Sequence, residues 1–162
     1  MSQIAETSAV ADVLTGLIQE TAHLYAKDLE ATPDDVLAAS QDGKARSILA
    51  FTAETIGFNF MIAGVLTGDN KPMPSPEERE AFTASINSKA AALAGLEASV
   101  SALTTAIQSV NSDDWVTVVT APWGMEATKS NICGWAALHT VYHDGQLNFI
   151  QVLNGDSAVH WM

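Results

Sequence analysis

Two histidines four residues apart, His139 and His143, have the clearest chemical potential in this chain. On an α-helix, positions i and i+4 lie on one face about one turn apart, so both imidazoles can reach one metal ion or one polar ligand. They share a helical stripe with residues that are mostly apolar: Ile132, Ala136, Gln146, Ile150 and Leu153. The apolar members predict that this stripe faces the core, where an unpaired imidazole would be costly.

Glu54 is the third residue of this candidate site. It is the only charged residue between Arg46 and Asp69. Its helical phase matches an apolar stripe formed by Phe51, Phe58, Met61 and Val65. A buried carboxylate without a partner protonates, whereas a metal ion or an imidazolium keeps it ionised. Two histidines and one carboxylate leave open coordination positions and suit zinc, nickel or iron.

A metal-free explanation of the same residues stays open. Core histidines commonly hydrogen-bond a carbonyl or a carboxylate, and Glu54 would then pair with one of them in a structural network. Spacing and phase agree with a metal site, but no cysteine or fourth ligand adds to them. A zinc-protease motif is disfavoured, because Thr140 occupies the place of its general-base glutamate.

The other polar residues are predicted to have supporting or solvent roles. Gln146 lies on the histidine stripe and is expected to support one of the two rings. Asp144 is expected to be solvated and Tyr142 to pack. His23 is predicted to lie at the surface, and Cys133 to be a small core residue.

Composition limits the classes of partner. The chain has 162 residues and a formal net charge of −12, which repels nucleic acid and anionic lipid. Residues 1–162 fit a single domain. The single cysteine forms no internal disulfide and the amino terminus lacks the features of a signal peptide, so we expect a cytoplasmic protein. Residues 47–68 could cross a bilayer, but their polar residues favour a buried bundle helix and no membrane partner.

Apolar periodicity predicts an all-α four-helix bundle. The long helical patterns cover about 4–29, 44–67, 76–110 and 128–153, with a short helical turn within 33–43. Ser75 and Thr128 are predicted helix caps. The β-branched segment 115–124 predicts a short extended or hairpin crossover before the last helix. The pocket between the second and fourth long helices is expected to be small, apolar and closed at one end.

The last helix resembles the signature of the DinB/YfiT-like family. In that signature, a His-x-x-x-His pair precedes Gly-Gln and a glycine at the helix end, as in His139-Thr-Val-Tyr-His143-Asp-Gly-Gln146 followed by Gly155. The segment from Pro122 to Thr128 also fits the crossover before that helix. The resemblance implies a four-helix bundle, often dimeric, that binds a divalent metal through one histidine on its second helix and the pair on its last.

The second helix of this chain contains no histidine. Phe51 lies near the expected first ligand, and Glu54, one turn on, is the nearby residue able to replace it. We therefore expect a metal on Glu54, His139 and His143, with zinc or nickel preferred and iron as a further option.

Some relatives in this family are thiol-dependent transferases or isomerases. The resemblance thus implies a homodimeric, metal-dependent thiol transferase or hydrolase that acts on a small molecule, with a low-molecular-weight thiol as partner. An open position on the metal would bind a thiolate or water and lower its pKa. The alternative is a non-catalytic dimeric bundle that binds a small ligand or a protein partner.

Overall fold

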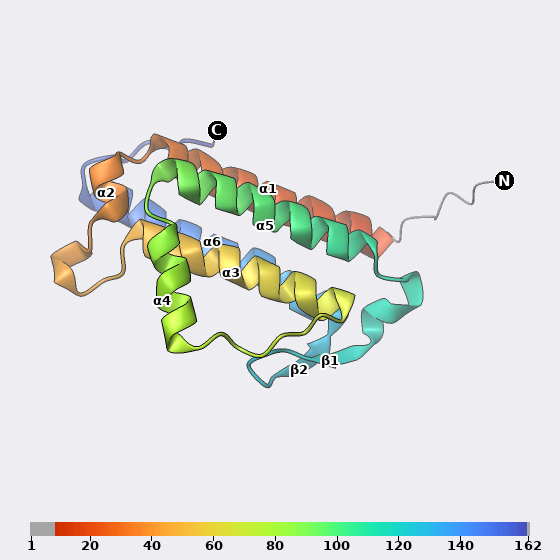
Figure 1. The fold of residues 1–162 in the computed structure, drawn as a ribbon. Helices are drawn as coiled ribbons and strands as arrows, with labels where there is room; N and C mark the ends of the chain where they lie inside the picture. Colours follow the sequence, from red (N-terminus) through yellow and green to blue (C-terminus); the bar gives the residue numbers. More distant parts are fainter. Residues whose placement is uncertain (1–8, 162) are drawn as a thin grey trace.

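Four long helices form a bundle in the computed structural model, which describes residues 9–161 (Figure 1). They are α1 (Ala9–Ala31), α3 (Ile48–Thr67), α5 (Lys89–Gln108) and α6 (Lys129–Leu153). The predicted all-α four-helix bundle is confirmed. The expected start of the first helix, near residue 4, lies outside the described residues.

The helix directions follow from contacts between their ends. Asn148 donates to the carboxylate of Asp28 at 2.9 Å, so the carboxyl-terminal parts of α6 and α1 lie together and these helices run in parallel. Lys89, at the start of α5, donates to the carbonyl of Glu30 near the end of α1 at 3.0 Å. Helix α5 is therefore antiparallel to α1. Helix α3 also begins beside the end of α1 and runs in the same direction as α5 (Figure 1).

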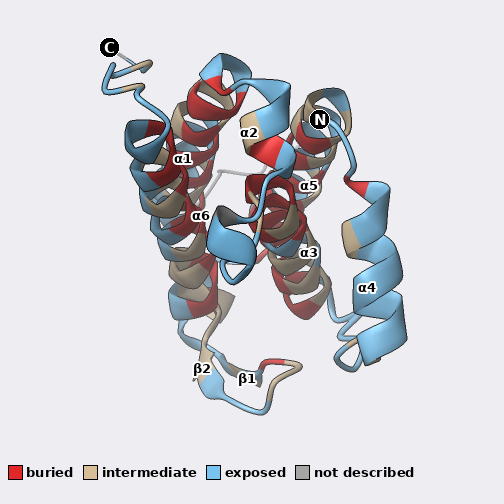
Figure 2. Ribbon diagram, turned by 90° about the vertical axis from the view of Figure 1, so that its left-hand side faces the viewer, coloured by how far each residue is buried: buried red, intermediate tan, exposed pale blue. Residues whose placement is uncertain are grey.

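The chain must return along the bundle between α3 and α5, because these helices run in the same direction. The linker 68–75 and α4 (Pro76–Ser85) make this return, and α4 lies outside the bundle with no buried residue (Figure 2). The prediction of one helix over 76–110 is wrong. Ile86 leaves helical geometry and is buried, and the side chain of Ser88 accepts from the backbone N–H of Ala91 to start a new helix.

Shorter elements close the two ends of the bundle. Helix α2 (Asp34–Ala38) and the 3₁₀ turn η1 (Gln41–Gly43) join α1 to α3. Helix α3 begins four residues later than the predicted Lys44, because Ser47 caps it. After the 3₁₀ turn η2 (Ser112–Val116), the strands β1 (Val118–Thr120) and β2 (Glu126–Thr128) pair antiparallel, so the predicted crossover is confirmed as a hairpin. The predicted caps at Ser75 and Thr128 are confirmed.

Helix α3 has more buried residues than the other three long helices, and polar as well as apolar residues are among them. Tyr25 Oη and Thr52 Oγ1 are 2.6 Å apart, and Asn59 donates to Ser99 at 3.2 Å. Two described helices, α3 and α5, are long and apolar enough to cross a membrane by length and composition alone. The most apolar stretches of α3 and α5 are 61% and 39% buried inside the bundle. Core helices of soluble proteins can have the same length and apolar composition.

Candidate metal centre

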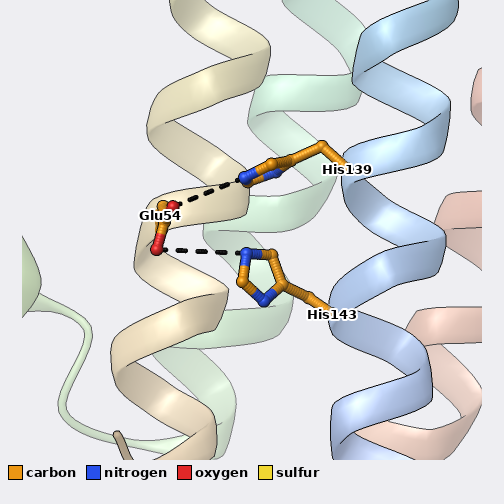
Figure 3. A group of neighbouring side chains, drawn as sticks. All are labelled: Glu54, His139 and His143. Carbon is orange, nitrogen blue, oxygen red and sulfur yellow. Dashed lines mark ion pairs between the residues drawn. The ribbon is translucent and has the colours of Figure 1, made fainter.

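The structure brings the three predicted site residues together (Figure 3). Glu54 projects from α3, and His139 and His143 project from α6 towards it. Glu54 Oε1 lies 3.5 Å from His139 Nε2, and Glu54 Oε2 lies 3.9 Å from His143 Nε2. One possible ligand atom from each residue lies within 4.8 Å of the other two. We call these three residues the candidate metal centre.

Glu54 is not buried, contrary to the interpretation of its helical phase. Its side chain is 44% exposed. The buried side of α3 includes Ile48, Thr55, Asn59 and Ile62. Because two of these residues are polar, the hydrophobic pattern of the sequence does not identify this side as buried. Glu54 lies on another face and forms the rim of the candidate metal centre.

Arg46 is a partner of Glu54 that sequence analysis missed. Its guanidinium hydrogen-bonds and ion-pairs with Glu54 Oε2, the oxygen that also faces His143. Arg46 precedes the capping residue of α3, so helical periodicity could not place it. Burial raises the pKa of Glu54, but the hydrogen bond and charge of Arg46, with the two histidines, outweigh it and lower the pKa overall. Glu54 is therefore ionised at neutral pH.

His143 has one ring nitrogen in use and one that is free. Its Nδ1 lies 2.8 Å from Gln146 Oε1, while the Gln146 amide nitrogen donates to Tyr142 Oη at 3.1 Å. This arrangement makes Nδ1 the protonated nitrogen and leaves a lone pair on Nε2. Nε2 is buried, has no hydrogen-bond partner among the described residues and faces Glu54. The expected support by Gln146 is confirmed. Tyr142, predicted to pack, contacts the ring of His143 edge-on with ring centroids 5.1 Å apart, but it is also 62% exposed.

These residues fit a divalent cation. Burial lowers the pKa of both His139 and His143, so the rings are neutral, as metal ligands must be. Ligand atoms about 2 Å from one zinc ion lie roughly 3–4 Å apart, close to the separations between Glu54 and the two rings. Small side-chain movements would therefore complete a site with two nitrogen ligands and one oxygen ligand.

Aromatic rings hold both imidazoles in place. Phe51 stacks on His143 with ring centroids 5.2 Å apart and planes 5° apart. Phe58 stacks on His139 at 4.4 Å and also on Trp123 at 5.3 Å. Packed aromatic rings exclude water from the bundle side of the histidines and restrict their rotation.

Glu54 and His139 also line a large groove, which we call the α4 groove. It lies between α4 and the linker before it on one side and α3 and α5 on the other, and Trp123 of the hairpin also lines it. Its volume is about 1790 Å³. The expectation of a small pocket closed at one end is wrong, because the break before α5 places α4 outside the bundle and leaves space beneath it.

Asp144 has a partner that the sequence did not reveal. It was expected to be solvated, but it is partly buried beside Asp28, and Asn148 contacts both carboxylates at 2.9 and 3.4 Å. Burial, followed by the charge of Asp28 and a hydrogen bond with it, raises the pKa of Asp144 to about 7. Asp28 is fully buried on α1. Its position three residues after Tyr25, an apolar residue on the core side of the same helix, is the signal that could have identified it.

The remaining candidates behave as predicted. His23 is exposed and lies outside the candidate metal centre. Cys133 is fully buried, and burial raises the pKa of its thiol to about 12. A thiol with such a pKa stays protonated at neutral pH and is a poor nucleophile.

Comparison with known proteins gives a likeness of fold. No protein-family model and no curated protein match the chain. Among solved structures, two of mycothiol-dependent maleylpyruvate isomerase are similar, one of them a single-site mutant. Their TM-scores are 0.65 and 0.62 at 21% and 20% sequence identity. The matches cover 85% of this chain and 60% of those chains, so this chain spans about three fifths of their length.

Proposed function

We propose that this protein is a DinB/YfiT-like enzyme of the cytoplasm that binds a divalent metal ion. Its substrate is a small molecule, to which it transfers a thiol or which it hydrolyses. Zinc or nickel is the preferred ion, with iron as a further option. The observation that carries the proposal is the buried Nε2 of His143, which has no hydrogen-bond partner among the described residues and faces an ionised carboxylate. A divalent cation satisfies both groups at once.

The similar solved structures favour thiol chemistry over a purely structural network. They are structures of an isomerase that depends on mycothiol. A low-molecular-weight thiol is therefore the proposed partner of this chain too. When bound, a divalent cation supplies an open coordination position that lowers the pKa of a thiol or a water molecule.

The residues of the chain would each contribute to that chemistry. Glu54, His139 and His143 would hold the ion through one oxygen and two nitrogens. Gln146 fixes the tautomer of His143, which keeps the ligand nitrogen unprotonated. Arg46 neutralises part of the charge of Glu54 and lies where it could bind an anionic substrate group.

We also propose that the protein is a homodimer. The outward side of α6 presents a stripe of apolar side chains without a charged residue, which we call the outer α6 face: Leu138, Val141, Tyr142, Phe149, Val152 and Leu153. These side chains are 50–67% exposed. An apolar surface of this kind is typical of a protein–protein interface, and an uncharged face lets two copies with strong negative charge meet with less repulsion.

Metal analysis tests the proposal directly. Protein purified without chelator or histidine tag should contain close to one divalent ion per chain by elemental analysis. His139→Ala and His143→Ala should each lose most of it, whereas His23→Ala should keep it because His23 lies at the surface. Full metal retention in the variant that lacks both His139 and His143 would refute the site.

Thiol binding separates an enzyme from a non-catalytic bundle. A low-molecular-weight thiol should change the absorption of cobalt-substituted protein and raise its melting temperature. His139→Ala should abolish both effects. If fully metallated protein neither binds nor turns over any of a panel of cellular thiols and small electrophiles, the non-catalytic ligand-binding bundle is the better explanation.

A further inference from the structure

We infer that the α4 groove binds an elongated aliphatic molecule with an anionic head, the head at the candidate metal centre and the chain along α3. This inference rests on the proposed function and names the class of its substrate. The observations that carry it are the origin, lining, length and charge of the groove.

The groove is open because the face of α3 opposite α4 carries small residues, which leave space between the two helices. Ala53, Gly57 and Gly64 of α3 line the groove. Phe82 of α4 reaches towards them, so a Cβ added at Gly57 would meet its ring at 3.6 Å. No residue of α4 is buried, so this helix forms a wall without closing onto the core (Figure 2).

Large apolar side chains line the groove and remain in contact with water. Phe60, Met73 and Phe82 are 43%, 39% and 38% exposed, and all three line it. Phe58 and Trp123, which stack beside His139, continue this apolar surface to the candidate metal centre. Apolar surface that lines a groove next to a reactive centre is covered most favourably by an apolar ligand.

The dimensions of the groove favour a long ligand over a compact one. Its volume of about 1790 Å³ exceeds the roughly 300–1,000 Å³ of pockets for drug-sized molecules. The α3 residues that line it extend from Ala50 to Thr67. At 1.5 Å per residue this is a rise of about 26 Å. From Glu54, where the head is placed, to Thr67 the rise is about 20 Å, and an extended aliphatic chain fits this length.

The charge of the groove favours an anionic head. Three of the seven basic residues of the chain line it, against four of its nineteen acidic residues. The basic residues are Arg46, Lys71 and Arg79, and the acidic ones are Glu54, Asp69, Glu78 and Glu80. The protein has a net charge of −12, but the charges that line the groove nearly cancel, and a divalent cation on Glu54 would give the groove a net positive charge. Arg46, beside Glu54, is the residue placed to bind the head.

Titration with alkanoates of increasing length tests the inference. Butanoate, octanoate and dodecanoate are added to the zinc-loaded full chain below their micellar concentrations, and the affinities are measured by calorimetry. Each methylene group that leaves water strengthens binding by up to about fourfold. With its chain only partly buried, dodecanoate should therefore bind at least about a hundredfold more tightly than butanoate. Dodecanoate should also change the absorption of cobalt-loaded protein. Equal affinities for all three acids would overturn the inference.

Two groove variants and a matched control locate the chain. Ala98→Trp fills the groove from α5, and Phe82→Ala removes part of the α4 wall without touching the core. Each should weaken dodecanoate binding, the tryptophan variant by at least about tenfold, and leave butanoate binding unchanged. Ala94→Trp, also exposed on α5 but outside the groove lining, should behave like the wild type. Equal dodecanoate affinity in the Ala98 and Ala94 variants would overturn the inference.

Metal content and thiol binding are measured on the same samples, so the two proposals fail separately. Metallated, thiol-binding protein without chain-length dependence overturns the aliphatic ligand alone. If the protein binds no metal but its alkanoate affinity still rises with chain length, the proposed enzymatic function is overturned and the aliphatic ligand is supported.

Discussion

At the residue scale, a short hydrogen-bond chain determines which nitrogen of His143 is free. Tyr142 orients the amide of Gln146, and Gln146 accepts from Nδ1 of His143. We predict that Gln146→Leu lowers zinc affinity about 10–100-fold, the usual effect of losing such a supporting group. Competition with a chromophoric chelator measures it.

Gln146→Glu is the matched control for this prediction. It keeps an acceptor for the Nδ1–H of His143 and should retain most of the affinity. If both variants bind zinc like the wild type, the hydrogen bond does not support the ligand.

The pair formed by Asp28 and Asp144 predicts a pH dependence of stability. Burial and the neighbouring carboxylate raise the pKa of Asp144 from 3.8 to about 7, so the folded protein holds this proton more tightly than the unfolded chain. The stabilisation is therefore complete below about pH 4 and is lost as pH rises through 7. Asp144→Asn mimics the protonated acid, so it should raise the melting temperature by a few degrees at pH 8 and by clearly less at pH 5, where only part of the stabilisation has been lost.

The comparison with the variant isolates this pair from the other titrating groups. His139 and His143 have lowered pKa values, so their contribution runs the other way and is lost as pH falls, but the variant retains both histidines. Asp12→Asn, on the exposed surface of α1, is the control. An equal stability difference between wild type and Asp144→Asn at pH 5 and pH 8 would contradict the raised pKa.

At the element scale, α4 and α5 differ in what they contribute to stability. Ser75 caps α4 and Ser88 caps α5, each by accepting a backbone N–H, but α4 has no buried residue, whereas α5 packs in the core. Ser88→Ala should therefore lower the free energy of unfolding by about 1 kcal/mol, as measured by urea denaturation. Ser75→Ala should leave global unfolding unchanged and accelerate hydrogen exchange within α4 alone.

These two variants carry the same chemical change at equivalent positions. An equal loss of global stability in both would show that α4 unfolds together with the bundle. The α4 groove would then have a rigid wall.

At the scale of the whole molecule, the outer α6 face predicts self-association. Leu138→Glu and Phe149→Glu place charge on this apolar face, where two highly acidic copies would meet. Light scattering at micromolar concentration should give a dimer for the wild type and the 17.1 kDa monomer for both variants. Val116→Glu changes an exposed apolar residue of η2 and should remain dimeric.

The metal content of these variants should not change, because neither Leu138 nor Phe149 belongs to the candidate metal centre or to the hydrogen-bond chain that supports it. A wild type that scatters as a monomer would reject the proposed homodimer.

The sequence by itself determined the features that depend on neighbours along the chain. The spacing of His139 and His143 places both rings on one side of α6, and Gln146 follows one turn later. Capping residues at Ser75 and Thr128 start their helices, and the β-branched segment before α6 pairs as a hairpin. Helix periodicity and capping act within a few residues, so local patterns are enough to predict them.

Only the tertiary structure decided which distant residues meet. It placed Glu54 at a rim with Arg46, split the expected third helix at the buried Ile86, and buried Asp28 against Asp144. Because α3 has polar residues on its core side, the spacing of its apolar residues could not predict which side of the helix faces the core. Each of these outcomes depends on packing between helices, where burial and a charge from another element outweigh the local preference of the residue itself.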